Sequence, residues 1–140
     1  MIARRFLLAL PLLALATPAF AEKEVEGRTP RRITSAESYV PTATLSAAIT
    51  SGYSFAGLLV VDAGFDVPDP KLREQIKKMD PRITDALRTA LAEYTYSRYR
   101  SGTAPDPDRI AITLQAAADR CIGKPGAKLL LSNVMVQRGR

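Results

Sequence analysis

Phe55-Ala-Gly-Leu-Leu-Val-Val-Asp-Ala-Gly-Phe-Asp-Val67 is the stretch that decides how this chain folds. Every second residue from Phe55 to Val67 is apolar or glycine, which is the period of a β-strand with one buried face. Leu58 and Val60 add apolar character to the other face before Asp62 and Asp66 restore polarity. The stretch therefore predicts a strand that is buried on both sides through its middle, beneath helices.

A second strand is expected just upstream, from Tyr39 to Ile49, because the residues there also alternate with a period of two. Pro41 suits the start of such a strand or an edge position, since proline has no N–H for a ladder. Thr50-Ser-Gly-Tyr-Ser54 has the composition of a turn, so an antiparallel hairpin of Tyr39–Ile49 and Phe55–Val67 is predicted. One face of the first strand would carry Tyr39, Pro41, Ala43, Leu45, Ala47 and Ile49.

Three helices are expected downstream, each preceded by an Asp-Pro pair: Asp69-Pro70, Asp80-Pro81 and Asp106-Pro107. The aspartate would accept unpaired backbone N–H groups as an N-cap, and a proline in the first turn lacks the N–H that would go unpaired there. An apolar stripe at helical spacing follows each pair. The stripes are Leu72, Ile76 and Met79; Ile83, Leu87, Ala90, Leu91 and Tyr94; and Ile110, Leu114, Ala117, Ala118 and Cys121.

Gly123 is placed to end the third helix, and Lys128–Val136 is predicted to be a closing strand. The order β-β-α-α-α-β predicts the α+β class, with a small antiparallel or mixed sheet and the helices on one face. The expected organisation is a signal peptide over residues 1–21, a flexible polar leader over 22–38, one domain over 39–137 and a short tail over 138–140.

Residues 1–21 have the three parts of a secretory signal peptide. An arginine pair, Arg4-Arg5, precedes an apolar run of 11 residues, Phe6–Ala16, and residues 17–21 end in a small-x-small pattern. Cleavage is expected between Ala21 and Glu22, which would place the mature chain in the periplasm. The general export route is favoured over the twin-arginine route, because the residue that normally separates the arginine pair from Phe-Leu is missing.

The alternative is that the segment stays uncleaved and anchors the chain in the inner membrane. A membrane span needs about 20 apolar residues, and the run here is shorter and is interrupted by Pro11. Cleavage is therefore the preferred interpretation.

Charge and composition restrict the function classes. The signal removes two of 20 basic residues and none of 14 acidic ones, so the net charge falls from +6 to +4. This mild excess disfavours nucleic acid as a partner, although it is compatible with proximity to an anionic membrane surface. Histidine is absent, which removes the commonest metal ligand and general base, and the single cysteine, Cys121, is expected to be a buried structural thiol. We therefore expect a non-enzyme without a metal or cofactor.

Two stretches carry chemistry that needs to be weighed. Asp62, Asp66 and Asp69 are better explained as a solvated strand end and a helix cap than as a metal or acid–base cluster. Tyr94–Arg100 interleaves aromatic and basic residues, as single-stranded nucleic-acid platforms do, but Tyr94 continues a buried stripe. The preferred interpretation is ordinary helix packing, with late arginines that suit the negative helix end. The alternative is a protein-binding surface, because tyrosine and arginine are enriched at interface hot spots. Its candidate residues, on or near another helix face, are Arg88, Tyr96, Tyr99 and Arg100.

From Ser38 to Gln137 the chain resembles the FliL family of flagellar basal-body-associated proteins. The resemblance is carried by an ordered set of segments rather than by one motif. The segments are Tyr39-Val-Pro41, Leu58-Leu-Val-Val-Asp-Ala-Gly-Phe65, Asp69-Pro-Lys-Leu72, Asp80-Pro-Arg-Ile-Thr-Asp-Ala-Leu87, Tyr94-Thr-Tyr96, Arg100-Ser101 and Val134-Met-Val-Gln137.

This resemblance implies a periplasmic domain related in fold to stomatin/prohibitin-type modules. Such domains self-associate around the flagellar stator and support torque generation by binding, and the resemblance transfers no defined binding residue. Members of that family normally keep an N-terminal transmembrane helix, whereas this chain has a signal-like segment, so a released domain would lose the local concentration that a tether gives. The expected function is an exported accessory of the flagellar motor. The alternative is a general periplasmic or envelope scaffold with no flagellar role.

Overall fold

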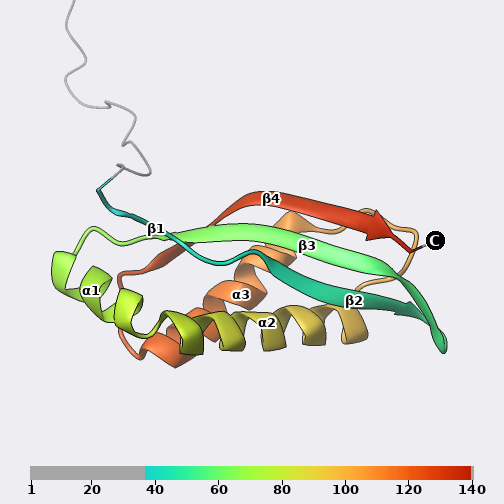
Figure 1. Ribbon diagram of the computed structural model, residues 1–140, viewed down its shortest axis with the longest axis horizontal. Helices are drawn as coiled ribbons and strands as arrows, with labels where there is room; N and C mark the ends of the chain where they lie inside the picture. Colours follow the sequence, from blue (N-terminus) through green and yellow to red (C-terminus); the bar gives the residue numbers. More distant parts are fainter. Residues whose placement is uncertain (1–36, 140) are drawn as a thin grey trace, which may run out of the picture.

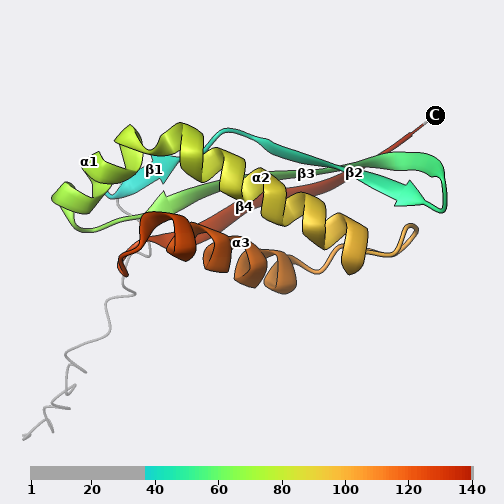
Figure 2. The same cartoon turned by 90° about the horizontal axis from the view of Figure 1, so that it is seen from below.

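β3 (Ser54–Asp66) is the central strand of a four-stranded antiparallel sheet in the computed structural model, which describes residues 37–139. β4 (Lys128–Arg138) pairs with one edge of β3, and β1 (Tyr39–Pro41) and β2 (Leu45–Ser51) pair in succession with the other edge (Figure 1). α1 (Pro70–Lys78), α2 (Asp80–Ser97) and α3 (Pro107–Ile122) form a second layer against one face of the sheet (Figure 2). The predicted α+β class, with the strands first, then the helices and a closing strand, is confirmed.

Residues 1–36 lie outside the described part of the chain, and with them the expected signal peptide, the cleavage site at Ala21/Glu22 and most of the leader. Among the described helices, none combines the length and the apolar character that a membrane crossing requires.

The predicted single strand from Tyr39 to Ile49 is wrong, because β1 and β2 are separated by residues 42–44. Pro41 lies opposite Gly64, so an unbroken ladder would place Leu45 opposite Val60, yet Leu45 lies opposite Val61. The shift of one residue reverses which side chains point inward, since strand residues alternate between faces. Val40 is consequently buried, whereas Pro41 and Ala43, which were expected on the inner face, are exposed.

β3 buries the face that its sequence predicts from Gly57 to Val67, but not at Phe55. Ile49 pairs with Gly57 and Thr50 pairs with Phe55, so Ala56 is an extra residue that forms a bulge. The bulge turns Phe55 to the outer face of the sheet, where it is 58% exposed. Sequence periodicity alone does not reveal such an insertion.

The outer face of β3 differs from the prediction as well. All the helices pack on the inner face, so Leu58 and Val60 are half-buried rather than covered (Figures 1 and 2). At one end of this outer face, the ring of Tyr39 lies directly over Gly64. The expectation of burial on both sides is therefore wrong.

Two of the three expected aspartate caps are confirmed. Asp69 accepts a hydrogen bond from Lys71 N at 2.9 Å, and Asp106 accepts from Asp108 N and Arg109 N at 3.1 and 3.2 Å. Asp80 is not a cap, because α1 and α2 are joined through one residue, Met79. The Met79 N–H donates to carbonyls of α1 while its carbonyl accepts from α2, so no non-helical position remains for Asp80 to occupy.

The core lies between the two layers and contains the apolar stripes predicted for the helices. α2 packs against β2 and against α3, and α3 packs against β4. Cys121 is half-buried rather than buried, since the last inward position of α3 is Ile122. Gly123 ends α3 in the left-handed conformation, with φ of 71°. The largest of the fully buried side chains are Leu45, Leu59, Val61, Phe65, Val67, Ile76, Ile83, Leu87, Leu91, Ile110 and Leu114.

Candidate functional site

Arg88 and Tyr96 lie on the outward face of α2. Both are exposed, and Tyr96 presents 88% of its surface to solvent. They are eight residues apart, with exposed Ala92 midway between them. This spacing separates them by about 12 Å along the helix axis and places them on the same side of the helix. The opposite face of α2 is fixed in the core by residues such as Leu87 and Leu91, both fully buried. These two candidate residues therefore project from a rigid element.

Tyr99 and Arg100 follow the end of α2 and do not continue this face. The Tyr99 ring lies 6.5 Å from that of Tyr94, is half-buried against the core, and its hydroxyl donates to the Thr103 carbonyl at 2.6 Å. Arg100 is exposed, and its carbonyl accepts from the N–H and the hydroxyl of Thr103 at 3.2 and 2.7 Å. Tyr99 thus holds the loop between α2 and α3 in place, while the side chain of Arg100 is available at the surface.

The three carboxylates considered for metal or acid–base chemistry are engaged separately. Asp62 accepts from the Thr44 hydroxyl at 2.7 Å and from the Asn133 amide at 3.3 Å. Asp66 accepts from the Ser38 hydroxyl at 2.6 Å, and Asp69 caps α1. Over residues 37–139 no group of three acidic or cysteine side chains is close enough to hold a metal ion.

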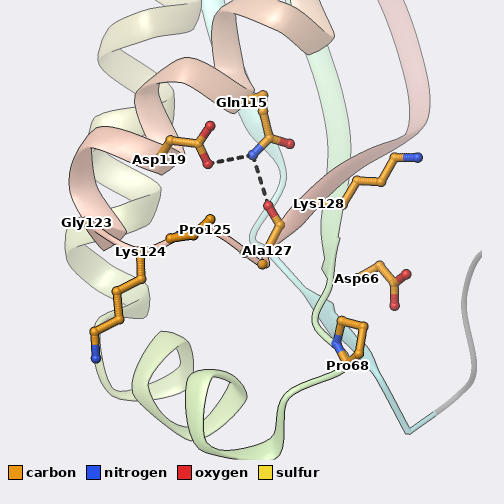
Figure 3. Close-up of a pocket in the computed structure, with 10 residues that line it drawn as sticks. Asp66, Pro68, Gln115, Asp119, Gly123, Lys124, Pro125, Ala127 and Lys128 are labelled. Atoms are coloured by element: carbon orange, nitrogen blue, oxygen red, sulfur yellow. Dashed lines mark hydrogen bonds between the residues drawn. The ribbon is translucent and has the colours of Figure 1, made fainter.

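A cavity lies where β3 ends, α3 ends and β4 begins, and sequence reasoning did not find it (Figure 3). Its volume is about 740 Å³, within the range of small-molecule pockets. The ammonium group of Lys124 is turned toward Gln75, 3.4 Å from its amide oxygen, rather than into the cavity. The lining residues are Asp66, Pro68, Gln115, Asp119, Gly123, Lys124, Pro125, Gly126, Ala127 and Lys128.

Gln115 organises one wall of this cavity. Its amide N–H groups donate to Asp119 at 2.8 Å and to the Ala127 carbonyl at 2.9 Å (Figure 3), and its amide oxygen accepts from Leu129 N at 2.7 Å. The side chain thereby pairs with the start of β4 as a neighbouring strand would. None of the lining residues carries a hydroxyl, thiol or imidazole, and the ionisable side chains among them are those of Asp66, Asp119, Lys124 and Lys128.

A second groove, of about 430 Å³, runs between α2 and α3. Small side chains such as Ala86, Ala90 and Ala117 line it, with half-buried Cys121 on one wall. The groove brings opposite charges to its rims, from Asp85 and Glu93 on α2 and from Arg120 on α3.

No family model matches the chain, and the search of curated proteins finds no match either. Arguments about function therefore depend on the residues and on their arrangement.

Proposed function

We propose that this chain is a non-catalytic, exported binding module of the FliL-like type that associates with the flagellar motor in the periplasm and supports motility. The observation that carries the proposal is the face of α2 defined by Arg88 and Tyr96, which presents interface-type side chains from a helix fixed in the core. The partners that the resemblance over residues 38–137 indicates are the flagellar stator and further copies of the chain.

The argument for binding at this α2 face is energetic. Tyrosine and arginine are the residue types whose loss most often costs more than about 2 kcal/mol at a protein interface. A large, stiff tyrosine ring loses little conformational entropy when it is covered, and 88% of the Tyr96 surface is uncovered here. Because the inner side of α2 is fully packed, a partner would meet these side chains without having to order the helix first.

The expected compartment follows from the signal-like segment. Cleavage between Ala21 and Glu22 would release the domain into the periplasm, whereas an uncleaved segment would hold it at the inner membrane. A tether raises the effective concentration of a binding module at its partner into the millimolar range. N-terminal sequencing of the protein from soluble and membrane fractions tests this point, and a chain that begins at Met1 in the membrane fraction would overturn release.

The function is tested in a deletion strain that is complemented with variants. We expect deletion to impair swimming, and we expect Arg88→Ala/Tyr96→Ala to fail to restore it while the purified variant keeps the wild-type melting temperature. The matched control is Ile112→Ala/Arg120→Ala, which removes one exposed apolar and one exposed basic side chain from α3 instead. Normal swimming of the deletion strain, together with an envelope-stress phenotype, would contradict the flagellar role and support a general envelope scaffold.

A further inference from the structure

The two ends of the sheet expose different side chains. The described residues begin beside β1 and α1, whereas the β2–β3 turn, the end of β4 and the loop after α2 lie together at the opposite end (Figures 1 and 2). β3 spans 13 residues, which corresponds to about 40 Å between the two ends. We define the distal end by five residues: Tyr53, Phe55, Arg98, Arg100 and Arg138.

The two aromatic side chains of the distal end are exposed to different extents. Tyr53 lies in the turn between β2 and β3 and is fully exposed, at 111% of its reference surface, and Phe55 is 58% exposed because the bulge at Ala56 turns it outward. A buried position would stabilise each ring by about 2 kcal/mol relative to water. Covering these two exposed rings with an apolar environment would therefore be favourable.

Three arginines lie at the same end of the domain, since Arg98 and Arg100 follow α2 and Arg138 is the last residue of β4. Arg138 lies opposite Gly57 in the ladder, one step beyond the bulge, and Gly139 N donates to the Ala56 carbonyl at 2.9 Å. The loop Ser101–Pro105 lines a cavity together with Arg138, which brings the end of α2 next to the end of β4. Arg98, Arg100 and Arg138 are exposed and form no ion pair within residues 37–139.

One acidic residue lies near two of these arginines, because Asp106 lines the same small cavity as Arg98 and Arg100. Its carboxylate caps α3 and pairs with Arg109 at 3.3 Å. The distal end therefore combines an excess of positive charge with exposed aromatic rings.

We propose that the distal end binds the surface of an anionic lipid bilayer. Tyr53 and Phe55 would insert at the level of the headgroups, where aromatic side chains are enriched in membrane proteins, and the three arginines would contact lipid phosphates. The distal end is opposite the end at which the described residues begin, and the proposed contact does not depend on the flagellar proposal.

The small aromatic area of the distal end favours a bilayer over a protein partner. A stable protein interface covers about 800 Å² of each partner, whereas the two rings have about 200 Å² each, and cavities hollow the surface beside the arginines. A lipid surface adapts to such an uneven end and needs no matching shape. Each arginine close to an anionic surface strengthens binding about fivefold, so three together account for about 100-fold.

The test measures the sedimentation of the chain from Glu22 with vesicles, since all core residues lie between Val40 and Leu129 and this chain contains them all. We expect binding to vesicles of phosphatidylglycerol and phosphatidylethanolamine, little binding to phosphatidylcholine alone, and a loss of binding as salt screens the charges. Arg98→Gln/Arg100→Gln/Arg138→Gln should weaken binding about 100-fold. Tyr53→Ser/Phe55→Ser should weaken it at constant charge.

The matched control is Lys71→Gln/Lys78→Gln/Lys128→Gln, which removes the same charge from exposed positions near the other end. It should retain most of the binding, and equal losses in the two triple variants would refute the assignment to the distal end. The proposal would also be overturned if the unsubstituted chain did not bind anionic vesicles. This holds even if the same residues were found to capture a protein.

A spectroscopic readout locates the contact independently. The chain has no tryptophan, so Tyr53→Trp introduces a single indole at the tip. Its emission should shift to shorter wavelength when anionic vesicles are added, whereas the emission of Ile112→Trp, at an exposed site on α3, should not change. Equal behaviour of the two probes would contradict the proposed orientation.

Discussion

Gly64 and Gly57 lie in the same strand, and replacing either by alanine tests what the structure places against β3. A Cβ at Gly64 would overlap the ring of Tyr39, and a Cβ at Gly57 would overlap the backbone carbonyl of Gln137. Overpacking of this kind costs about 1–3 kcal/mol. Because a ring can be removed and a backbone cannot, we expect the Gly64→Ala cost to disappear in a Tyr39→Ala background, whereas Gln137→Ala should not relieve Gly57→Ala.

Gly64→Ala alone should lower the free energy of unfolding by about 2 kcal/mol. In the Tyr39→Ala background the same change should be neutral or stabilising by about 0.5–1 kcal/mol relative to Tyr39→Ala alone, since alanine in a strand loses less backbone entropy than glycine. The coupling energy of the pair is thus about 2–3 kcal/mol. For a domain of this size, the single change lowers the melting temperature by about 8–16 °C.

The assay is urea unfolding of the four members of each double-mutant cycle, followed by far-ultraviolet circular dichroism. If Gly64→Ala is equally destabilising with and without the Tyr39 ring, the ring does not lie over Gly64 and the register of β1 on β3 is wrong. Rescue of Gly57→Ala by Gln137→Ala would likewise contradict a backbone contact at that position.

Three further changes test other parts of the structure. Asp106→Ala should destabilise the domain by about 1 kcal/mol, because Asp106 caps α3. Asp80→Ala should cost about half of that or less, because Asp80 caps no helix. Chemical denaturation measures both, and equal costs would contradict the junction at Met79. Gln115→Ala should lower the free energy of unfolding by about 1–3 kcal/mol, because Ala127 O and Leu129 N lose their side-chain partner. The hydrogen exchange of the Leu129 N–H should also accelerate, and unchanged exchange would refute the role of Gln115 at β4. Val61→Thr should cost about 1–3 kcal/mol because it buries a hydroxyl, while Val60→Thr on the open outer face should cost less than about 1 kcal/mol; similar melting temperatures for the two variants would show that the outer face is covered.

The fold was largely predictable because each element carries its own period. The alternation along Phe55–Val67 and the three helical stripes report burial residue by residue, and burial dominates the stability of such a domain. The Asp-Pro pairs located two helix starts by a local mechanism that needs no tertiary information. At the third pair the same local signal gave a wrong cap, because the path of the chain through Met79 is set by how α1 and α2 pack together.

The errors in strand facing share one physical origin. Shifts of one residue, at residues 42–44 and at Ala56, change which face a side chain occupies without changing the composition of the strand. They account for the exposure of Pro41 and Phe55. A turn residue as large as Tyr53 was the available signal for an exposed aromatic tip, because turns lie at the surface and a ring there has little to pack against.

The candidate partner surface was predictable only in part. Helical geometry places Arg88 and Tyr96 on one face of α2, but Tyr99 follows the end of the helix, where no periodicity applies. Its position depends on a hydrogen bond to Thr103 and on contact with Tyr94, and both depend on where the loop returns. The cavity beside Gln115 was not predictable for a similar reason, because it joins the ends of three elements that are distant in sequence.

The two proposed contacts constrain one another, because both belong to one rigid body. α2 runs along the long direction of the sheet (Figure 2), so a domain that stands on a bilayer by its distal end would present Arg88 and Tyr96 sideways, toward proteins in the same membrane. Membrane binding would then raise the local concentration of the α2 face at such partners. The arginine variant of the distal end should therefore weaken partner capture on anionic vesicles while leaving capture in solution unchanged, whereas Arg88→Ala/Tyr96→Ala should weaken both. Equal effects of the two variants in solution would mean that the arginines contact the protein partner directly.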